Sequence, residues 1–222
     1  MNSLPIIVVS SPKEKSGSSV LALNLAGALW NDGYKVGLLS SDASETATFL
    51  KERAKFSQAK NAKIFMPKRV ENPAQSDEIS ALVADIKAKD YAQYEDVFSL
   101  AHTLITPLNS ENDVSWQAND TYLNFIWKIK KNQAARGVKY LNWIIVPYLK
   151  QNTTDFSDKL QTQAKRFGFK IAPAIYYRDE YMHINEGYCA SDLRNKKLED
   201  MMTLKDVYAR REILQLTDFI WK

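Results

Sequence analysis

The sequence contains very little cysteine, histidine and glycine. Its single cysteine, Cys189, cannot form a disulfide within the chain, and with only two histidines it cannot build a zinc-ligand cluster. The 7 glycines among 222 residues are fewer than half of the usual ~7%, so sites lined by closely approaching backbone should be rare. These shortages exclude a disulfide scaffold and a structural zinc domain, and they favour a reducing compartment.

Long apolar runs and a strong excess of one charge are also missing. No stretch reaches the ~20 apolar residues of a membrane-spanning helix, and the first residues, MNSLPIIVVSS, lack the basic start of a signal peptide. A formal net charge of +4 does not by itself indicate a nucleic-acid-binding protein. We therefore expect a soluble, cytoplasmic protein with a membrane partner unlikely, folded as a single domain over residues 1–222.

The first 42 residues predict a strand, a helix and a second strand. Residues 4–10 are apolar without alternation, which is typical of a strand buried on both faces of a parallel sheet. A polar link, SPKEKSGSS, leads to a helix over residues 20–33 that Gly33 ends. Its predicted buried face consists of Leu21, Leu25, Ala28 and Leu29. YKVGLLSSD supplies the second strand, so residues 5–42 form a right-handed βαβ unit.

The rest of the chain continues the alternation of helices and strands. Further strands are predicted at 78–85, at 100–108 after a helix end and closed by Pro107, at 140–149 and at 169–177. Helices are predicted within 43–74, at 122–137, at 155–168 and from Leu204 to the end, the last docking on the sheet or on a partner. The pattern indicates an α/β fold with a mostly parallel central sheet and helices on both faces.

The segment SPKEKSGSSVLALNLAGALWNDGYKVGLLSSD resembles the deviant Walker A unit, K-G-G-x-G-K-[ST], of the ParA/MinD superfamily of P-loop ATPases. The resemblance implies a three-layer P-loop NTPase-like fold. It places Lys13 at the signature lysine that crosses to the partner's nucleotide in a sandwich dimer, and Gly17 at the last glycine. It also places Ser19 at the hydroxyl that binds magnesium.

This sequence departs from that motif at several positions. Glu14 and Lys15 replace two glycines, and Ser18 replaces the phosphate-binding lysine. A lysine charge about 4 Å from a phosphate charge is worth roughly 4 kcal/mol at an effective dielectric of 20. Lys15 can compensate only in part, because it lacks the freedom of glycine at positive φ. We therefore expect ATP and magnesium to be weakly held.

Of three further positions at which the family has an acidic side chain, this sequence has lost one and keeps two. In the stretch LLSSDAS, Ser40 stands where the family has the aspartate that positions the attacking water, and Asp42 keeps the second aspartate. Asp85 keeps the acid that ends the third strand, in the context Asp85-Ile86-Lys87-Ala88. No catalytic residue is assigned, since Ser40 stands at the position of the lost aspartate.

Later segments resemble the division-positioning MipZ branch of the superfamily. They are LAHTLITPLNSENDVSW, IAPAIYYRDEYMHINEGYCASDL and MTLKDVYARREILQL. The resemblance implies binding of ATP, a homodimer, nonspecific association with DNA, and a division or partition protein as partner. These segments are structural signatures, so they support common descent more than activity.

Each candidate site residue has a plain structural alternative. Cofactor binding is assigned to Lys13, Lys15, Gly17, Ser18 and Ser19, and magnesium binding to Ser19, Asp42 and Asp85. The alternatives are solvated lysines, a helix N-cap at Ser19, and strand-end capping by the two aspartates. A possible DNA-binding surface is formed by Lys128, Lys130, Lys131, Arg136 and Lys139, although such charges often only solvate a helix face.

Three functions remain open at this point. The first is a degenerate regulator of DNA partition or division positioning that acts through protein or nonspecific DNA binding, with little or no ATP hydrolysis. The second is a working ATPase switch in which Lys13 or Lys15 replaces the missing contact and nucleotide drives dimerisation. The third is a ligand-free interaction module. ATP titration separates them.

Overall fold

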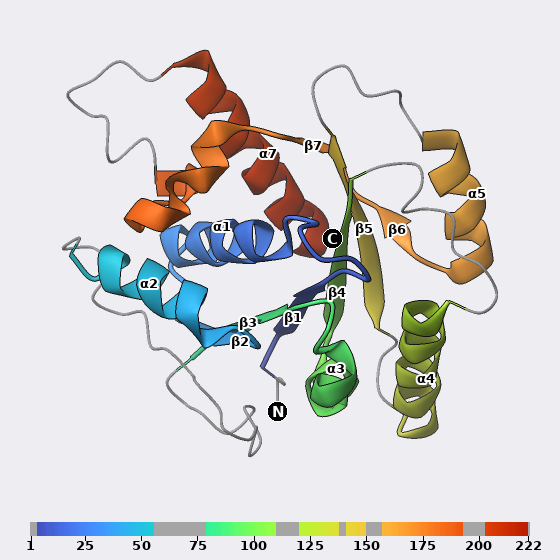
Figure 1. Ribbon diagram of the computed structural model, residues 1–222. Coiled ribbons are helices and arrows are strands. Elements are labelled where there is room, and N and C mark those ends of the chain that lie inside the picture. The colour runs from blue at the N-terminus through green and yellow to red at the C-terminus, as the bar shows by residue number, and fades with distance from the viewer. Residues whose placement is uncertain are drawn as a thin grey trace.

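The computed structural model describes residues 4–55, 79–109, 120–137, 141–149, 157–192 and 203–221. A parallel sheet lies between two layers of helices, which confirms the predicted fold (Figure 1). The strand order is β2-β3-β1-β4-β5-β6, and β7 also pairs with β5. The strands are β1 (Ile6–Ser10), β2 (Val36–Ser40), β3 (Ala81–Ile86), β4 (Thr103–Leu108), β5 (Asn142–Leu149), β6 (Lys170–Ile171) and β7 (Ile175–Tyr176).

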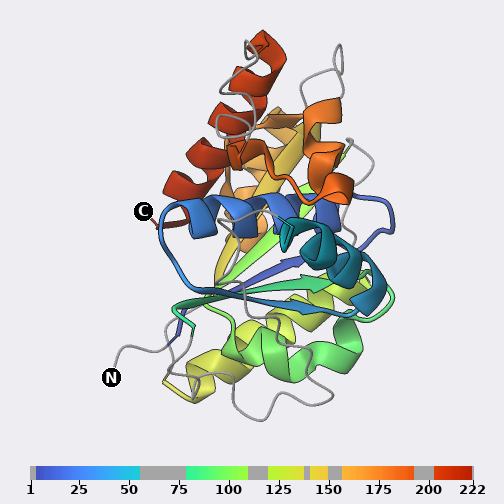
Figure 2. The ribbon, with the colours of Figure 1, turned by 90° about the vertical axis from the view of Figure 1, so that its left-hand side faces the viewer.

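The helices divide between the two faces of the sheet (Figure 2). One face packs against α1 (Ser18–Asn31), α2 (Ala43–Arg53), α7 (Leu204–Trp221) and the 3-10 segments η5 (Asp179–Glu186) and η6 (Ala190–Asp192). The other face packs against α3 (Glu95–Leu100), α4 (Thr121–Ala135) and α5 (Ser157–Phe167), with η3 (Tyr91–Tyr94) before α3. Two apolar cores therefore flank one sheet, as expected for strands whose two faces are both covered.

The first helix is buried on more sides than its sequence suggested. The predicted βαβ unit is present, and Gly33 follows α1 with φ of 90°, where its N–H donates to Trp30 O at 3.0 Å. However, residues 21–29 are all buried rather than one face alone. The reason is that η5, η6 and α7 cover the outer side of α1, where the buried Asn24 accepts a hydrogen bond from Ala190 N–H at 2.7 Å.

Two strand predictions were wrong in detail, both around proline. Pro107 does not close β4 but lies within it, which is possible because the paired register with β1 already ends at Ile105. Residues 169–177 form two short strands instead of one, because Pro173 has no N–H for the ladder. Both short strands pair with β5, β6 at Ile144 and Ile145 and β7 at its far end.

The C-terminal helix docks on the sheet layer, as predicted. Ile213, Leu216 and Ile220 are buried in the core beneath α7. Trp221 is partly exposed but stacks on Tyr34, with ring centroids 6.0 Å apart. Among the helices of the described ranges, none is long and apolar enough to cross a membrane.

Candidate functional site

The predicted site residues meet at the carboxyl edge of the sheet. In the parallel register, Asp85 of β3 is paired with Val9 of β1 on one side and with Ser40 of β2 on the other. The loop after β1 leads directly into α1, so its residues lie at the same edge. The arrangement of strand, loop and helix N-terminus that binds phosphate in P-loop proteins is therefore present.

Two residues of the loop between β1 and α1, one of them a lysine, have a left-handed backbone conformation. Gly17 has φ of 85° and Lys15 has φ of 57°. Lys15 adopts positive φ although it lacks the freedom of glycine there, and the conformation costs a side-chain-bearing residue about 1–2 kcal/mol. Its carbonyl oxygen accepts a hydrogen bond from Asn109 Nδ2 at 3.3 Å, which helps to fix this conformation. Two of the loop's residues, Lys15 and Gly17, therefore have positive φ.

A side chain at Gly17 would be strained, because the backbone there has φ of 85°. A Cβ atom placed there would lie 3.3 Å from Cε1 of Tyr148, at the end of β5. Tyr148 is itself buried among other rings, with its ring centroid 5.0 Å from that of Tyr177. The aromatic cluster therefore packs directly against the backbone of the predicted anion loop.

Ser19 does not cap α1, contrary to the structural alternative considered for it. Gly17 holds the N-cap position and no side chain caps this helix. Instead, the Ser19 hydroxyl accepts a hydrogen bond from Lys87 Nζ at 2.7 Å, and the same ammonium donates to Glu45 Oε2 at 2.7 Å. Sequence reasoning assigned no role to Lys87. Its place two residues after Asp85 was the only available signal, and spacing along the chain could not show that it reaches α1.

Asp85 is a buried carboxylate rather than a capping residue. It is 2% exposed, its Oδ1 has no hydrogen-bond partner, and Ser40 Oγ approaches its Oδ2 at 3.4 Å. Burial raises the pKa of Asp85 to about 6, although hydrogen bonding from Ser19 and the charge of Lys87 pull it down. Strand-end capping by Asp85 is therefore not observed.

Asp42 caps the start of helix α2, whereas the structural alternative had predicted that it caps the end of a strand. Its side chain holds the N-cap position of α2 and accepts a hydrogen bond from Ser44 N–H at 3.2 Å. Hydrogen bonds from the Ser44 hydroxyl and N–H hold the pKa of Asp42 below its ordinary value. This carboxylate is thus engaged with its own helix.

The arrangement does not fit a magnesium ion. The Ser19 hydroxyl already contacts an ammonium, and Asp42 is bonded to Ser44. Across the described ranges, no three His, Cys, Asp or Glu side chains gather in a way that could hold a metal. For the nucleotide, Lys13 and Lys15 are exposed on the loop, while Ser18 begins α1 at the position of the phosphate-binding lysine. No chemical step is therefore derived through a bound metal.

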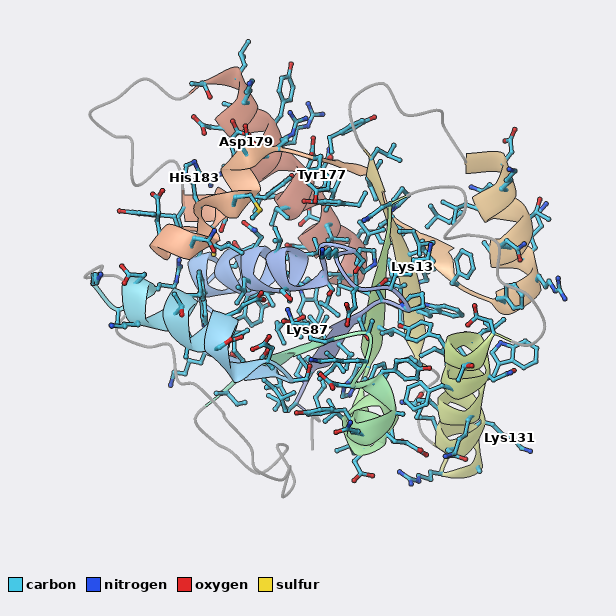
Figure 3. The ribbon with its side chains drawn as sticks, in the orientation of Figure 1. Lys13, Lys87, Lys131, Tyr177, Asp179 and His183 are labelled. Atoms are coloured by element: carbon cyan, nitrogen blue, oxygen red, sulfur yellow. The ribbon has the colours of Figure 1, made fainter. Side chains whose placement is uncertain are left out.

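The predicted basic surface on α4 is only partly available to a ligand. Lys130 turns inward, donating to the carbonyl oxygens of Phe167 and Gly168 at 3.4 and 3.0 Å, and burial lowers its pKa. Lys128 is paired with Glu95. Lys131, labelled in Figure 3 well apart from Lys13 and Lys87, is exposed, as is Arg136, while Lys139 lies outside the described residues.

An exposed aromatic ring accompanies these lysines. Trp127 is 52% exposed and borders a hollow of about 330 Å³ between α4 and the end of α5. The hollow is lined by Trp127, Lys128, Lys130, Lys131 and Phe167. A flat ring beside lysines is the combination that contacts bases and phosphates together.

Comparison with known proteins agrees with this fold. MinD cell division protein from Aquifex aeolicus superposes with a TM-score of 0.64 at 13% identity, covering 98% of this chain and 96% of that one. A putative plasmid partition protein from Borrelia burgdorferi B31, bound to AMPPNP, gives 0.56 at 12% identity, covering 98% of both. Cobyrinic acid a,c-diamide synthase from Mycobacterium smegmatis, with bound ATP analog and magnesium, gives 0.57 at 16% identity, covering 89% of this chain and 98% of that chain. No curated protein sequence matches this chain.

The fold and the strand-loop-helix arrangement are those of the ParA/MinD superfamily of P-loop proteins. The family model described as ATPase MipZ matches residues 72–220. The chain therefore belongs to the MipZ family, within a group of proteins of partition and division positioning.

Proposed function

We propose that this chain is a regulator of DNA partition or division positioning that acts by binding protein or DNA, with little or no ATP hydrolysis. The observation that carries the proposal is Ser18 at the start of α1, at the position of the motif's phosphate-binding lysine. Losing a contact of roughly 4 kcal/mol lowers affinity about a thousandfold. Ser40 at the end of β2 also removes the carboxylate that would position a water.

Titration of the purified chain with ATP tests this function. We expect affinity in the millimolar range or weaker by calorimetry, in magnesium and in EDTA alike, and no release of phosphate above background. Micromolar binding with turnover would instead support the ATPase switch, the second candidate. That alternative is favoured by Asp85, whose buried oxygen without a hydrogen-bond partner lies at the carboxyl edge of the sheet, and by the exposed Lys13.

Restoring the motif should restore nucleotide affinity. The triple variant Glu14→Gly, Lys15→Gly, Ser18→Lys is expected to bind ATP at least tenfold more tightly than the wild type, because it regains an ammonium beside the phosphates. Glycine is compatible with position 15, since the backbone there already has positive φ. The control variant Ser18→Ala should bind ATP with the same affinity as the wild type. Equal affinities for the triple variant and the wild type would show that the alignment of the motif is wrong.

For DNA, the proposal rests on the exposed part of the α4 surface. We expect Lys131→Glu with Arg136→Glu to weaken binding to duplexes of unrelated sequence, and to reduce the slope of log affinity against log salt by about 2. In a matched control, glutamate reverses the charges of Lys51 and Lys205, which are exposed on α2 and α7. The measurement is fluorescence anisotropy over a range of salt. Affinity that is indifferent to salt, or equal losses in both variants, would contradict a specific role for α4.

Homodimer formation and the identity of a division or partition partner stay predictions. Sedimentation of the purified chain, with and without ATP, tests the first of them. A dimer that forms only with ATP would favour the ATPase switch. A dimer that forms equally well without ATP is consistent with the proposed regulator.

A further inference from the structure

A lysine ammonium lies among oxygen atoms of the kind that surround a divalent cation. Lys87 Nζ donates to Ser19 Oγ and to Glu45 Oε2, each at 2.7 Å. Hydroxyl and carboxylate oxygens are the ligands that magnesium takes from proteins, and an ammonium with its three donors binds the same atoms. Lys87 therefore supplies a positive charge at the hydroxyl that the motif assigns to the metal.

A buried carboxylate with an unused oxygen belongs to the same cluster. Asp85 is 2% exposed, and its Oδ1 has no hydrogen-bond partner. The charges of Asp85 and Lys87 act on one another, and Lys87 Nζ donates a hydrogen bond to the Ser19 hydroxyl. An ionised carboxylate is costly to bury unless a positive charge is close. Lys87 is the cation that supplies this charge from within the chain.

The position of Lys87 is fixed by the ends of two strands. Its N–H donates to Ser41 Oγ at 2.9 Å, and Ser41 N–H in turn donates to the carbonyl oxygen of Asp85 at 3.0 Å. The side chain of Lys87 is 22% exposed and is labelled between α1 and the strands in Figure 3. Burial alone would lower its pKa, but the hydrogen bond to Glu45 and the charge of Asp85 raise it, so the ammonium stays charged.

We propose that the ammonium of Lys87 takes the place of the divalent cation and joins α1, α2 and β3 without any metal. Two consequences follow. The wild-type site is closed to magnesium, and removal of the ammonium with retention of side-chain volume opens it to a divalent cation. This inference goes beyond the proposed function, because it concerns metal alone and holds whether or not the chain binds nucleotide.

The test compares Lys87→Met with Lys89→Met, which removes an exposed lysine from the same loop. Thermal unfolding of the full chain is measured in EDTA and in magnesium chloride, and binding of Mn²⁺ by electron paramagnetic resonance, without nucleotide. We expect the Tm of the wild type and of Lys89→Met to be the same in both buffers, with no bound Mn²⁺. We expect Lys87→Met to unfold several degrees lower in EDTA, to regain stability in magnesium and to bind one Mn²⁺.

A second substitution shows where the metal binds. Adding Asp85→Asn to Lys87→Met should abolish both the Mn²⁺ signal and the stabilisation by magnesium. Metal binding by the wild type, or indifference of Lys87→Met to metal, overturns the proposal. If Lys87→Met does not fold in either buffer, Lys87→Gln replaces it under the same criteria. ATP turnover by the wild type would overturn the proposed function without changing these metal measurements, so the two failures are distinguishable.

Discussion

Replacing Arg53 by methionine is expected to lower the free energy of unfolding by about 3–5 kcal/mol, because it leaves a buried carboxylate without its partner. The Arg53 guanidinium bonds to both carboxylate oxygens of Asp192, and their side chains are only 9% and 12% exposed. Its Nη1 also donates to Gly187 O at 3.1 Å, and its Cζ lies 5.0 Å from the centre of the Trp30 ring. The substitution removes all of these contacts at once.

Denaturation with urea measures this loss. The matched control is Lys51→Met, an exposed basic residue on the same helix, which should change stability by less than about 0.5 kcal/mol. In Arg53→Met with Asp192→Asn, part of the loss should be recovered, because no unpaired charge remains buried. If Arg53→Met alone were as stable as the wild type, the Arg53–Asp192 pair would make no net contribution to the free energy of unfolding.

Replacing Asp85 by asparagine is expected to stabilise the protein at neutral pH and to remove part of its pH dependence. The folded-state pKa of about 6 lies above the ordinary aspartate value of 3.8. Between these values the native state holds more protons than the unfolded state, so stability falls as pH rises through this window. This difference between the folded and ordinary pKa values corresponds to roughly 3 kcal/mol at pH 7. The groups that act on Asp85 are Lys87, Glu45, Ser19 and Ser40.

The measurement is the difference in unfolding free energy between Asp85→Asn and the wild type, taken by urea denaturation from pH 4 to pH 7. We expect this difference to grow as pH rises. Asp42→Asn serves as a control that should be nearly flat over this range, because the pKa of Asp42 is lowered in the folded state and its stabilising contribution changes only below its ordinary value of 3.8. A difference that is flat with pH would show that Asp85 is not titrating in a buried environment.

The main elements of the fold could be predicted because its signals are local. Continuous apolar runs around Val8 and Val83 indicate strands buried on both faces, and the polar loop between β1 and α1 follows from the sequence alone. The positions of Asp42 and Asp85 at one edge follow from the parallel register. These features depend on periodicity and on neighbours in the chain, which a sequence contains directly.

The parts that could not be predicted depend on distant contacts. Lys87 reaches Ser19 across 68 positions, and Arg53 reaches Asp192 across 139. Neither pairing leaves a periodic pattern. Lys130 was assigned to a DNA-binding surface by its charge, but its ammonium is held by carbonyl oxygens after α5. Lys15 has positive φ, a conformation that the propensity of a lysine opposes, and its carbonyl oxygen is bonded by the distant Asn109.

The close packing of Gly27 against Cys189 has a practical consequence. The thiol is fully buried, a Cβ on Gly27 would lie 2.2 Å from its Sγ, and burial raises its pKa. Since thiolate is the species that reacts with alkylating agents and oxidants, the native protein should resist both. The rate at which a maleimide labels Cys189 would then report how often the C-terminal segments lift away from α1, so that an unmodified chain carries its own probe of local opening.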